Sequence, residues 1–136
     1  MPDQSSDDVP GLDAALHLVG PLEGRIMREV WLGRVVCPFV VRDMVARMPE
    51  LAYTTVMTTL NRLADKGLLQ RGGSSAQRAY PYRLTGTPED FLRQAGQAEV
   101  DDLIARFGDA ALAAFAARMD SLSPEQHRRL QELAHQ

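Results

Sequence analysis

Apolar positions recur every three to four residues in three short segments of the first half of the chain. This spacing predicts helices over residues 21–32, 41–48 and 53–66, each with one apolar face. Pro21 favours the start of the first helix because its backbone φ is already helical and its missing N–H needs no partner there. Gly67 favours the end of the third helix because glycine readily adopts the left-handed conformation of a C-terminal cap.

After Gly67 the apolar period changes from 3.6 to 2, the period of a half-buried β-strand. Two short strands are predicted over residues 68–71 and 79–84. The Gly/Ser-rich residues 72–78 between them have the composition of a hairpin loop. The sequence therefore predicts three helices followed by one β-hairpin.

Helical spacing returns in the last third of the chain. Residues 87–90, Thr-Pro-Glu-Asp, have the pattern of a helix start and open a long amphipathic helix, which is expected to be interrupted at Gly96 and to end at Gly108. An Ala-rich helix is predicted over residues 109–119. Residues 123–126, Ser-Pro-Glu-Gln, match a capping box and open the last helix.

Charge divides the chain into three parts, although its overall net charge is only −3. Residues 1–19 carry four acids and no Lys or Arg, and are predicted to be a largely flexible acidic tail with at most a short turn. Residues 20–85 carry ten bases and five acids, whereas residues 86–136 carry five bases and nine acids. A basic segment between acidic flanks is typical of a polyanion-binding module that carries a separate interaction segment.

The order of the predicted elements within the basic segment describes a winged helix-turn-helix. The predicted fold is therefore mainly α with a small β-hairpin wing. Residues 20–85 would form the winged-helix DNA-binding domain, and residues 86–136 a C-terminal helical dimerisation domain. In such modules the third helix enters the major groove of DNA, and the wing lies along the phosphates or in the minor groove.

The third predicted helix and the wing carry side chains suited to DNA. The hydroxyl groups of Thr54, Thr55 and Thr58 are short enough to let the helix approach base edges and thymine methyl groups. Basic side chains near them can neutralise phosphates, and Tyr53 begins the same helix. The further candidates for contact with DNA are Tyr53, Arg62, Lys66, Arg71, Arg78 and Arg83. A solvated helix face would carry similar residues, but their coincidence with the wing and the positive charge favours double-stranded DNA as the partner.

Residues 51–69 closely resemble the recognition-helix signature of the penicillinase-repressor family, which includes the methicillin-resistance repressors and, more distantly, copper-responsive ones. The segment reads Leu-Ala-Tyr-Thr-Thr-Val-Met-Thr-Thr-Leu-Asn-Arg-Leu-Ala-Asp-Lys-Gly-Leu-Leu. The opening of the first helix, residues 20–31, and the segments 107–109 and 122–133 are also similar, so the resemblance covers about residues 18–134.

The resemblance implies a homodimeric repressor that binds a dyad operator with a TACA/TGTA-like core. Carried onto matching positions, the DNA-facing residues would be Thr54, Thr55, Thr58 and Arg62, with support from Arg78 in the wing. Met57 stands where some relatives have a basic residue, which leaves open whether Met57 contacts a base.

Two departures from the family pattern concern the inducing signal. Copper-responsive relatives carry a C-terminal cysteine cluster, but Cys37 is the only cysteine here, which excludes thiolate copper sensing. In the antibiotic-responsive branch the repressor is cut at an Asn-Phe bond after a membrane sensor protease signals. The corresponding pair here is Ala114–Phe115, so cleavage by that protease, or one downstream of it, and release by a ligand both stay open.

Dimerisation also follows from the apolar residues beyond the winged helix. A winged helix has a complete core of its own, whereas three further amphipathic helices would leave much apolar surface uncovered unless a second copy buried it. The alternative is that they pack on their own N-terminal domain. The candidate dimerisation residues are Leu103, Ile104, Phe107, Leu112, Phe115, Met119, Leu130 and Leu133.

Other classes of protein are less well supported. Cys37 lies beside Pro38 in an apolar connector, and the three histidines have no nucleophile or metal-ligand pattern around them, so we expect no enzyme, cofactor or metal site. A winged helix that binds a protein instead of DNA is an alternative, although the positive charge of residues 20–85 favours DNA. The acidic N-terminus and the lack of a long apolar run predict a cytoplasmic protein without a signal peptide or membrane span.

Overall fold

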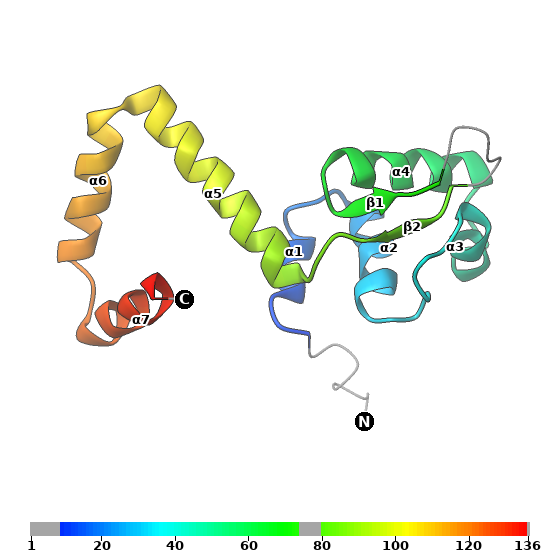
Figure 1. The fold of residues 1–136 in the computed structure, drawn as a ribbon, viewed down its shortest axis with the longest axis horizontal. Coiled ribbons are helices and arrows are strands. Elements are labelled where there is room, and N and C mark those ends of the chain that lie inside the picture. Colours follow the sequence, from blue (N-terminus) through cyan, green and yellow to red (C-terminus); the bar gives the residue numbers. More distant parts are fainter. Residues whose placement is uncertain (1–8, 74–79, 136) are drawn as a thin grey trace. The chain divides into compact units, whose positions relative to one another are not determined.

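The computed structural model describes residues 9–73 and 80–135 (Figure 1). The chain forms two compact units, Met1–Gln94 and Ala95–Gln136. The boundary lies inside the long helix α5 (Pro88–Phe107), later than the predicted boundary after residue 85. The reason is that Phe91 and Leu92, in the first turns of α5, pack against the core of the N-terminal unit.

The three helices predicted for the basic segment are present. They are α2 (Pro21–Trp31), α3 (Val41–Arg47) and α4 (Tyr53–Asp65), and each ends one residue earlier than predicted. Gly67 follows α4 with a φ of +84°, the left-handed conformation expected after a helix. Apolar side chains from all three helices meet in one core, together with Phe39, Leu68, Leu69 and Tyr82.

A two-stranded antiparallel sheet follows α4 and lies alongside it (Figure 1). It consists of β1 (Leu69–Arg71) and β2 (Tyr82–Leu84). Arg71 is paired with Tyr82, and Gln70 with Arg83. The strands are shorter than predicted. The segment before α3 adds a bridge that the sequence pattern did not reveal, in which Phe39 and Tyr82 exchange main-chain hydrogen bonds of 2.9 and 2.7 Å.

The N-terminal segment contains a short helix, which corrects the predicted flexible tail only in its later part, since residues 1–8 lie outside the residues that the structure describes. Helix α1 (Leu12–Leu16) places Leu12 and Ala15 in the core. Gly11 precedes it with a φ of +77°, and a Cβ at this position would lie 3.0 Å from Cδ1 of Leu92. Glycine suits this position for two reasons: it readily adopts a positive φ, and it has no Cβ to crowd Leu92 of α5. Five helical residues are too few to show a period in the sequence.

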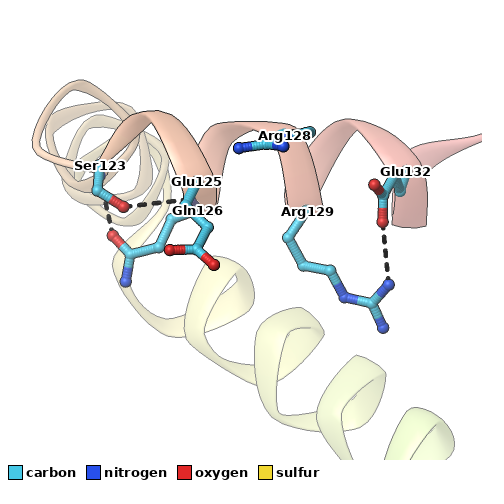
Figure 2. Close-up of a pocket in the computed structure, with 6 residues that line it drawn as sticks. All are labelled: Ser123, Glu125, Gln126, Arg128, Arg129 and Glu132. Atoms are coloured by element: carbon cyan, nitrogen blue, oxygen red, sulfur yellow. Dashed lines mark hydrogen bonds and ion pairs between the residues drawn. The ribbon is translucent and has the colours of Figure 1, made fainter.

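The C-terminal unit contains the end of α5, helix α6 (Asp109–Asp120) and helix α7 (Pro124–Ala134). The predicted interruption at Gly96 is wrong, because α5 runs unbroken through it. One glycine costs a helix about 1 kcal/mol relative to alanine, which flanking helix formers readily offset. The predicted capping box is present at α7, where the hydroxyl of Ser123 accepts from the backbone N–H of Gln126 at 3.1 Å (Figure 2).

The protein is thus mainly helical with one small antiparallel hairpin, as predicted for a winged helix followed by a helical segment. In the parts of the chain that the structure describes, no helix has the length and apolar character needed to cross a membrane.

Candidate nucleic-acid interface

Helix α4 has a sharply divided surface. Val56, Leu60 and Leu63 are fully buried, and they fix the helix against the core of the N-terminal unit. Thr54, Thr55, Thr58 and Arg62 are all exposed. The structure therefore brings the predicted hydroxyl groups together on one solvent-facing side of α4, whose opposite side is packed in the core.

The remaining threonine of this helix does not belong to that face. Thr59 is buried, and its hydroxyl donates to the main-chain carbonyl of Thr55 at 2.8 Å. Because the side chain is buried and its proton is donated within the helix, Thr59 is not available to a partner outside the protein. Thr58 and Thr59 are thus neighbours in sequence with different surroundings.

A second exposed strip of α4 begins at Tyr53. Tyr53 and Met57, one helical turn apart, are 48% and 37% exposed, and Asn61 continues the strip one turn further on. Asn61 is half-buried because it contacts the hairpin, where its side-chain oxygen accepts a hydrogen bond from Tyr82. Helical spacing alone puts Asn61 on the outward side of α4 and does not reveal this contact.

Lys66, at the end of α4, is held by an ion pair with α2. Its ammonium lies 2.8 Å from Oε1 of Glu23, and the same carboxyl oxygen accepts from the backbone N–H of Gly20 at 2.9 Å. Burial by itself raises the pKa of the Glu23 carboxyl, but the hydrogen bonds from Lys66 and Gly20 and the charges of Lys66 and Arg62 outweigh it and lower the pKa. This ion pair gives Lys66 a structural role beside the phosphate-binding role predicted for it.

Other bases of the N-terminal unit are also paired with acids. The buried carboxylate of Glu29 receives Arg34 at 2.7 Å and Arg47 at 2.9 Å, which ties α2 to α3. Arg25 pairs with Glu50 at the surface. The acids of these pairs are already counted in the balance of ten bases and five acids over residues 20–85, so the pairs leave the net charge unchanged and determine where it lies. The charge that remains for a partner lies mainly on α4 and the hairpin.

The hairpin carries Arg71 and Arg83 on opposite faces, because side chains alternate along a strand. Arg71 faces α4, where it donates to Oδ1 of Asn61 at 3.0 Å and lies 5.3 Å from the ring centroid of Tyr80. Arg83 is exposed on the other face. Arg78, predicted to support DNA binding from the wing, lies outside the residues that the structure describes.

In the C-terminal unit, apolar side chains reach solvent from all three helices. Phe107 and Leu112 are 56% and 51% exposed, and Met119, Leu130 and Leu133 are also exposed. Leu103, Ile104 and Phe115 are half-buried. An apolar hollow of about 280 Å³ lies among Leu103, Phe107, Ala110, Ala111, Ala114 and Phe115. The predicted dimerisation residues therefore remain largely uncovered within a single chain.

The predicted cleavage pair, Ala114–Phe115, lies in the middle of α6. Ala114 is exposed and Phe115 is half-buried, and regular helix continues on both sides of them.

A polar hollow of about 670 Å³ lies beside α7 and is lined by Ser123, Glu125, Gln126, Arg128, Arg129 and Glu132 (Figure 2). Its polar groups largely satisfy one another: Ser123 and Gln126 form the capping box, and Arg129 lies 3.2 Å from Glu132. These surface groups contain no nucleophile beside a base. Among the described residues, no three His, Cys, Asp or Glu side chains gather as a metal site would require.

Three core-forming helices, a hairpin beside the third and an exposed polar face on that third helix define the class of winged-helix DNA-binding transcriptional regulators. More narrowly, the chain belongs to the penicillinase repressor family, whose model matches residues 19–136. This confirms the resemblance seen in the sequence. The family match begins after α1, so α1 lies outside it.

Several solved structures are similar to the chain. Apo wild-type MarR from E. coli is 15% identical with a TM-score of 0.43, over 98% of this chain and 88% of that one. A mutant of MepR from a multidrug-resistant S. aureus clinical isolate is 17% identical with a TM-score of 0.44, over 82% and 84%. A MarR family regulator from Neisseria meningitidis is 21% identical with a TM-score of 0.34, over 94% and 82%. Comparison with curated proteins gives no match.

Proposed function

We propose that the protein is a homodimeric transcriptional repressor that binds a dyad operator through α4 and the wing of each subunit. The observation that carries this proposal is the exposed threonine face of α4, set on a helix whose opposite face is fully buried. A helix fixed in this way can present short hydroxyl groups to base edges with little loss of side-chain entropy.

Within this interface, Thr54, Thr55 and Thr58 read bases in the major groove of an operator with a TACA/TGTA-like core. Arg62 and Arg71, which are exposed, bind phosphates, and Arg78 and Arg83 extend these contacts along the wing. Tyr53 flanks the base-reading face at the start of α4. Lys66 adds a weaker phosphate contact at the end of α4, because Glu23 offsets part of its charge while half of its side chain stays exposed.

A second copy of the chain covers the apolar surface of the C-terminal unit. The support is the exposure of Phe107, Leu112, Met119 and Leu133 in the single chain, since a surface of this kind is a liability unless a partner buries it. A twofold dimer presents two DNA-binding units to two half-sites, which matches a dyad operator. Linking the two contacts raises the overall affinity by a factor on the order of 10²–10⁴.

Repression is relieved by a cut within α6 at Ala114–Phe115, in response to a β-lactam or another signal. A membrane sensor protease or a protease downstream of it would make the cut. The support is the position of this pair, which lies in the hollow formed with Leu103 and Phe107, within the surface proposed to bind the second copy. Cutting there would separate the two DNA-binding units and remove the affinity that their linkage provides.

Selection of bound fragments from the genomic DNA of the source organism by the purified full chain tests the proposal. We expect enrichment of sites with twofold symmetry, and a binding constant that falls steeply as the salt concentration rises. Binding with weak salt dependence and no enriched sequence would contradict DNA recognition and would favour a winged helix that binds a protein.

A further inference from the structure

Asn61 of α4 accepts two hydrogen bonds from the hairpin at one atom. Its Oδ1 lies 2.7 Å from the hydroxyl of Tyr82 and 3.0 Å from Nη1 of Arg71. Tyr82 and Arg71 are paired across the two strands, so both bonds come from one rung of the hairpin. One side-chain oxygen of the recognition helix therefore receives both of these hydrogen bonds from the wing.

The Tyr82 side of this junction is rigid. Tyr82 is 2% exposed, its ring stacks on Phe39 at a centroid distance of 5.9 Å, and its main chain bridges to the same residue. Burial raises the pKa of the Tyr82 phenol, although Arg71 opposes this, so the hydroxyl keeps its proton and donates it at neutral pH. Asn61 is thus held by a donor that cannot readily move.

The Arg71 side of the junction is exposed, and its partners are uncharged. One N–H group of Arg71 donates to the amide oxygen of Asn61, and the guanidinium lies 5.3 Å from the ring centroid of Tyr80. An arginine carries five N–H donors, so this hydrogen bond uses only one of them. Lys66, Arg34 and Arg47 differ in this respect, because each faces a buried carboxylate that offsets its charge. Arg71 is ordered without being neutralised.

We propose that Asn61 is a positioning residue for DNA binding: it locks the wing to the recognition helix and holds Arg71 as a preset phosphate-binding group. This inference rests on the proposed function, since it assumes that Arg71 meets a phosphate while Thr58, three residues before Asn61 on the same helix, meets a base. A long side chain that becomes ordered only on binding costs about 0.5–1.5 kcal/mol. This cost corresponds to about a twofold to twelvefold loss of affinity relative to a side chain that is already ordered in the free protein.

The test uses full-length chains with Asn61→Ala, Arg71→Ala, both together, and Tyr82→Phe, which keeps the ring and removes only the hydroxyl. Affinity for operator and for random duplex DNA is measured over a range of salt concentrations. We expect Arg71→Ala to lower the salt dependence by about one phosphate contact. Asn61→Ala should weaken both DNAs about twofold to twelvefold when Arg71 is present, and should have a clearly smaller effect when residue 71 is already alanine, because only the bond to Tyr82 is then lost.

Tyr82→Phe should repeat this pattern at smaller size, and it keeps the test decisive if Asn61→Ala does not fold. Gln70→Ala, a change of an exposed neighbour in β1, is the matched control and should leave both affinities unchanged. Equal loss from Asn61→Ala in the wild-type chain and in the Arg71→Ala variant would overturn the proposal, because it would show a general effect on the fold. An unchanged salt slope in Arg71→Ala would overturn it as well. A wild-type chain that binds no DNA would instead refute the proposed function itself.

Discussion

The ammonium of Lys66 lies 2.8 Å from Oε1 of Glu23, and this pair joins the end of the recognition helix α4 to the first turn of α2. Glu23 also caps its own helix by accepting from the backbone N–H of Gly20. One buried carboxylate thus stabilises the start of α2 and the position of α4. The ion pair connects two residues that are far apart in the sequence, and it holds the half-exposed side chain of Lys66 against the start of α2.

The first prediction concerns this pair and pH. Because the pKa of Glu23 is lowered in the folded protein, its contribution to stability is complete above its ordinary value of 4.5 and is lost as the pH falls through the folded-state value. We expect Glu23→Gln to lower the free energy of unfolding by about 1–2 kcal/mol at pH 7, a modest figure because Lys66 is half exposed. The variant should also lose less stability than the wild type as the pH falls below 4.5.

Urea unfolding at a series of pH values measures both effects. Glu99→Gln, a change of an exposed glutamate in α5, is the control and should behave like the wild type. If Glu23→Gln and the wild type lost stability in parallel below pH 4.5, the ion pair would not contribute as argued.

Most of the fold could be predicted from local sequence, because helix spacing and the glycine after α4 act over a few residues. Gly67 illustrates this: its place after the last apolar residue of the helix predicts the left-handed conformation that it adopts. Gly96 illustrates the limit, since a weak local preference for a break is overridden by the helix around it.

The candidate site was predicted less completely, because its partners are distant in sequence. The exposed threonine face of α4 follows from helical spacing alone. The contacts of Lys66 with Glu23 and of Asn61 with Tyr82 connect different elements, and no periodicity within one helix can reveal them. Helix α1 was predicted as no more than a short turn, because its five residues are too few to establish a helical period and its burial depends on packing against another element, α2.

The second prediction separates two adjacent threonines of α4. Thr58→Ala should weaken operator binding selectively, by about 1–3 kcal/mol if its side chain makes a good base contact, and should affect random DNA little. Thr59→Val is the matched control because Thr59 is buried and bonded to the carbonyl of Thr55. It should cost about 0.5–1.5 kcal/mol of stability and leave the ratio of operator to random binding unchanged.

Fluorescence anisotropy with both DNAs and thermal unfolding of both variants provide the measurements. Equal weakening of operator and random DNA by Thr58→Ala would mean that α4 does not present this face to the bases.

The third prediction concerns the apolar surface of the C-terminal unit. Phe107 is 56% exposed, and Phe107→Glu should break the proposed dimer because it would bury an unpaired charge in an apolar interface. The wild-type chain of 15.0 kDa should sediment as a dimer at about 10 μM, a concentration typical of such experiments, and the variant as a monomer.

Val36→Glu is the control, because Val36 is 81% exposed and belongs to the N-terminal unit, whereas the predicted dimerisation residues all belong to the C-terminal unit. It should remain dimeric. A wild-type chain that sediments as a monomer, or a dimer that survives Phe107→Glu unchanged, would contradict the proposed interface. In the first case, the apolar residues would need a different partner.

The last prediction concerns the proposed cut at Ala114–Phe115. The pair lies within regular helix, so a protease can reach the bond only when α6 opens locally. Ala114→Gly lowers helix stability by about 1 kcal/mol, which raises the open population about fivefold. We therefore expect the intact 15.0 kDa chain to disappear about fivefold faster from cells treated with a β-lactam, as followed by immunoblotting.

Ala98→Gly makes the same substitution at an exposed position of α5 and should leave the rate of cleavage at α6 unchanged. Fragment masses from the treated cells locate the bond that is cut. If transcription of the repressed gene rose while the chain stayed intact, cleavage would not be the signal. Release would then require a ligand that binds the DNA-free dimer more tightly than the DNA-bound dimer. Only such a difference in affinity can shift the equilibrium away from the DNA-bound dimer.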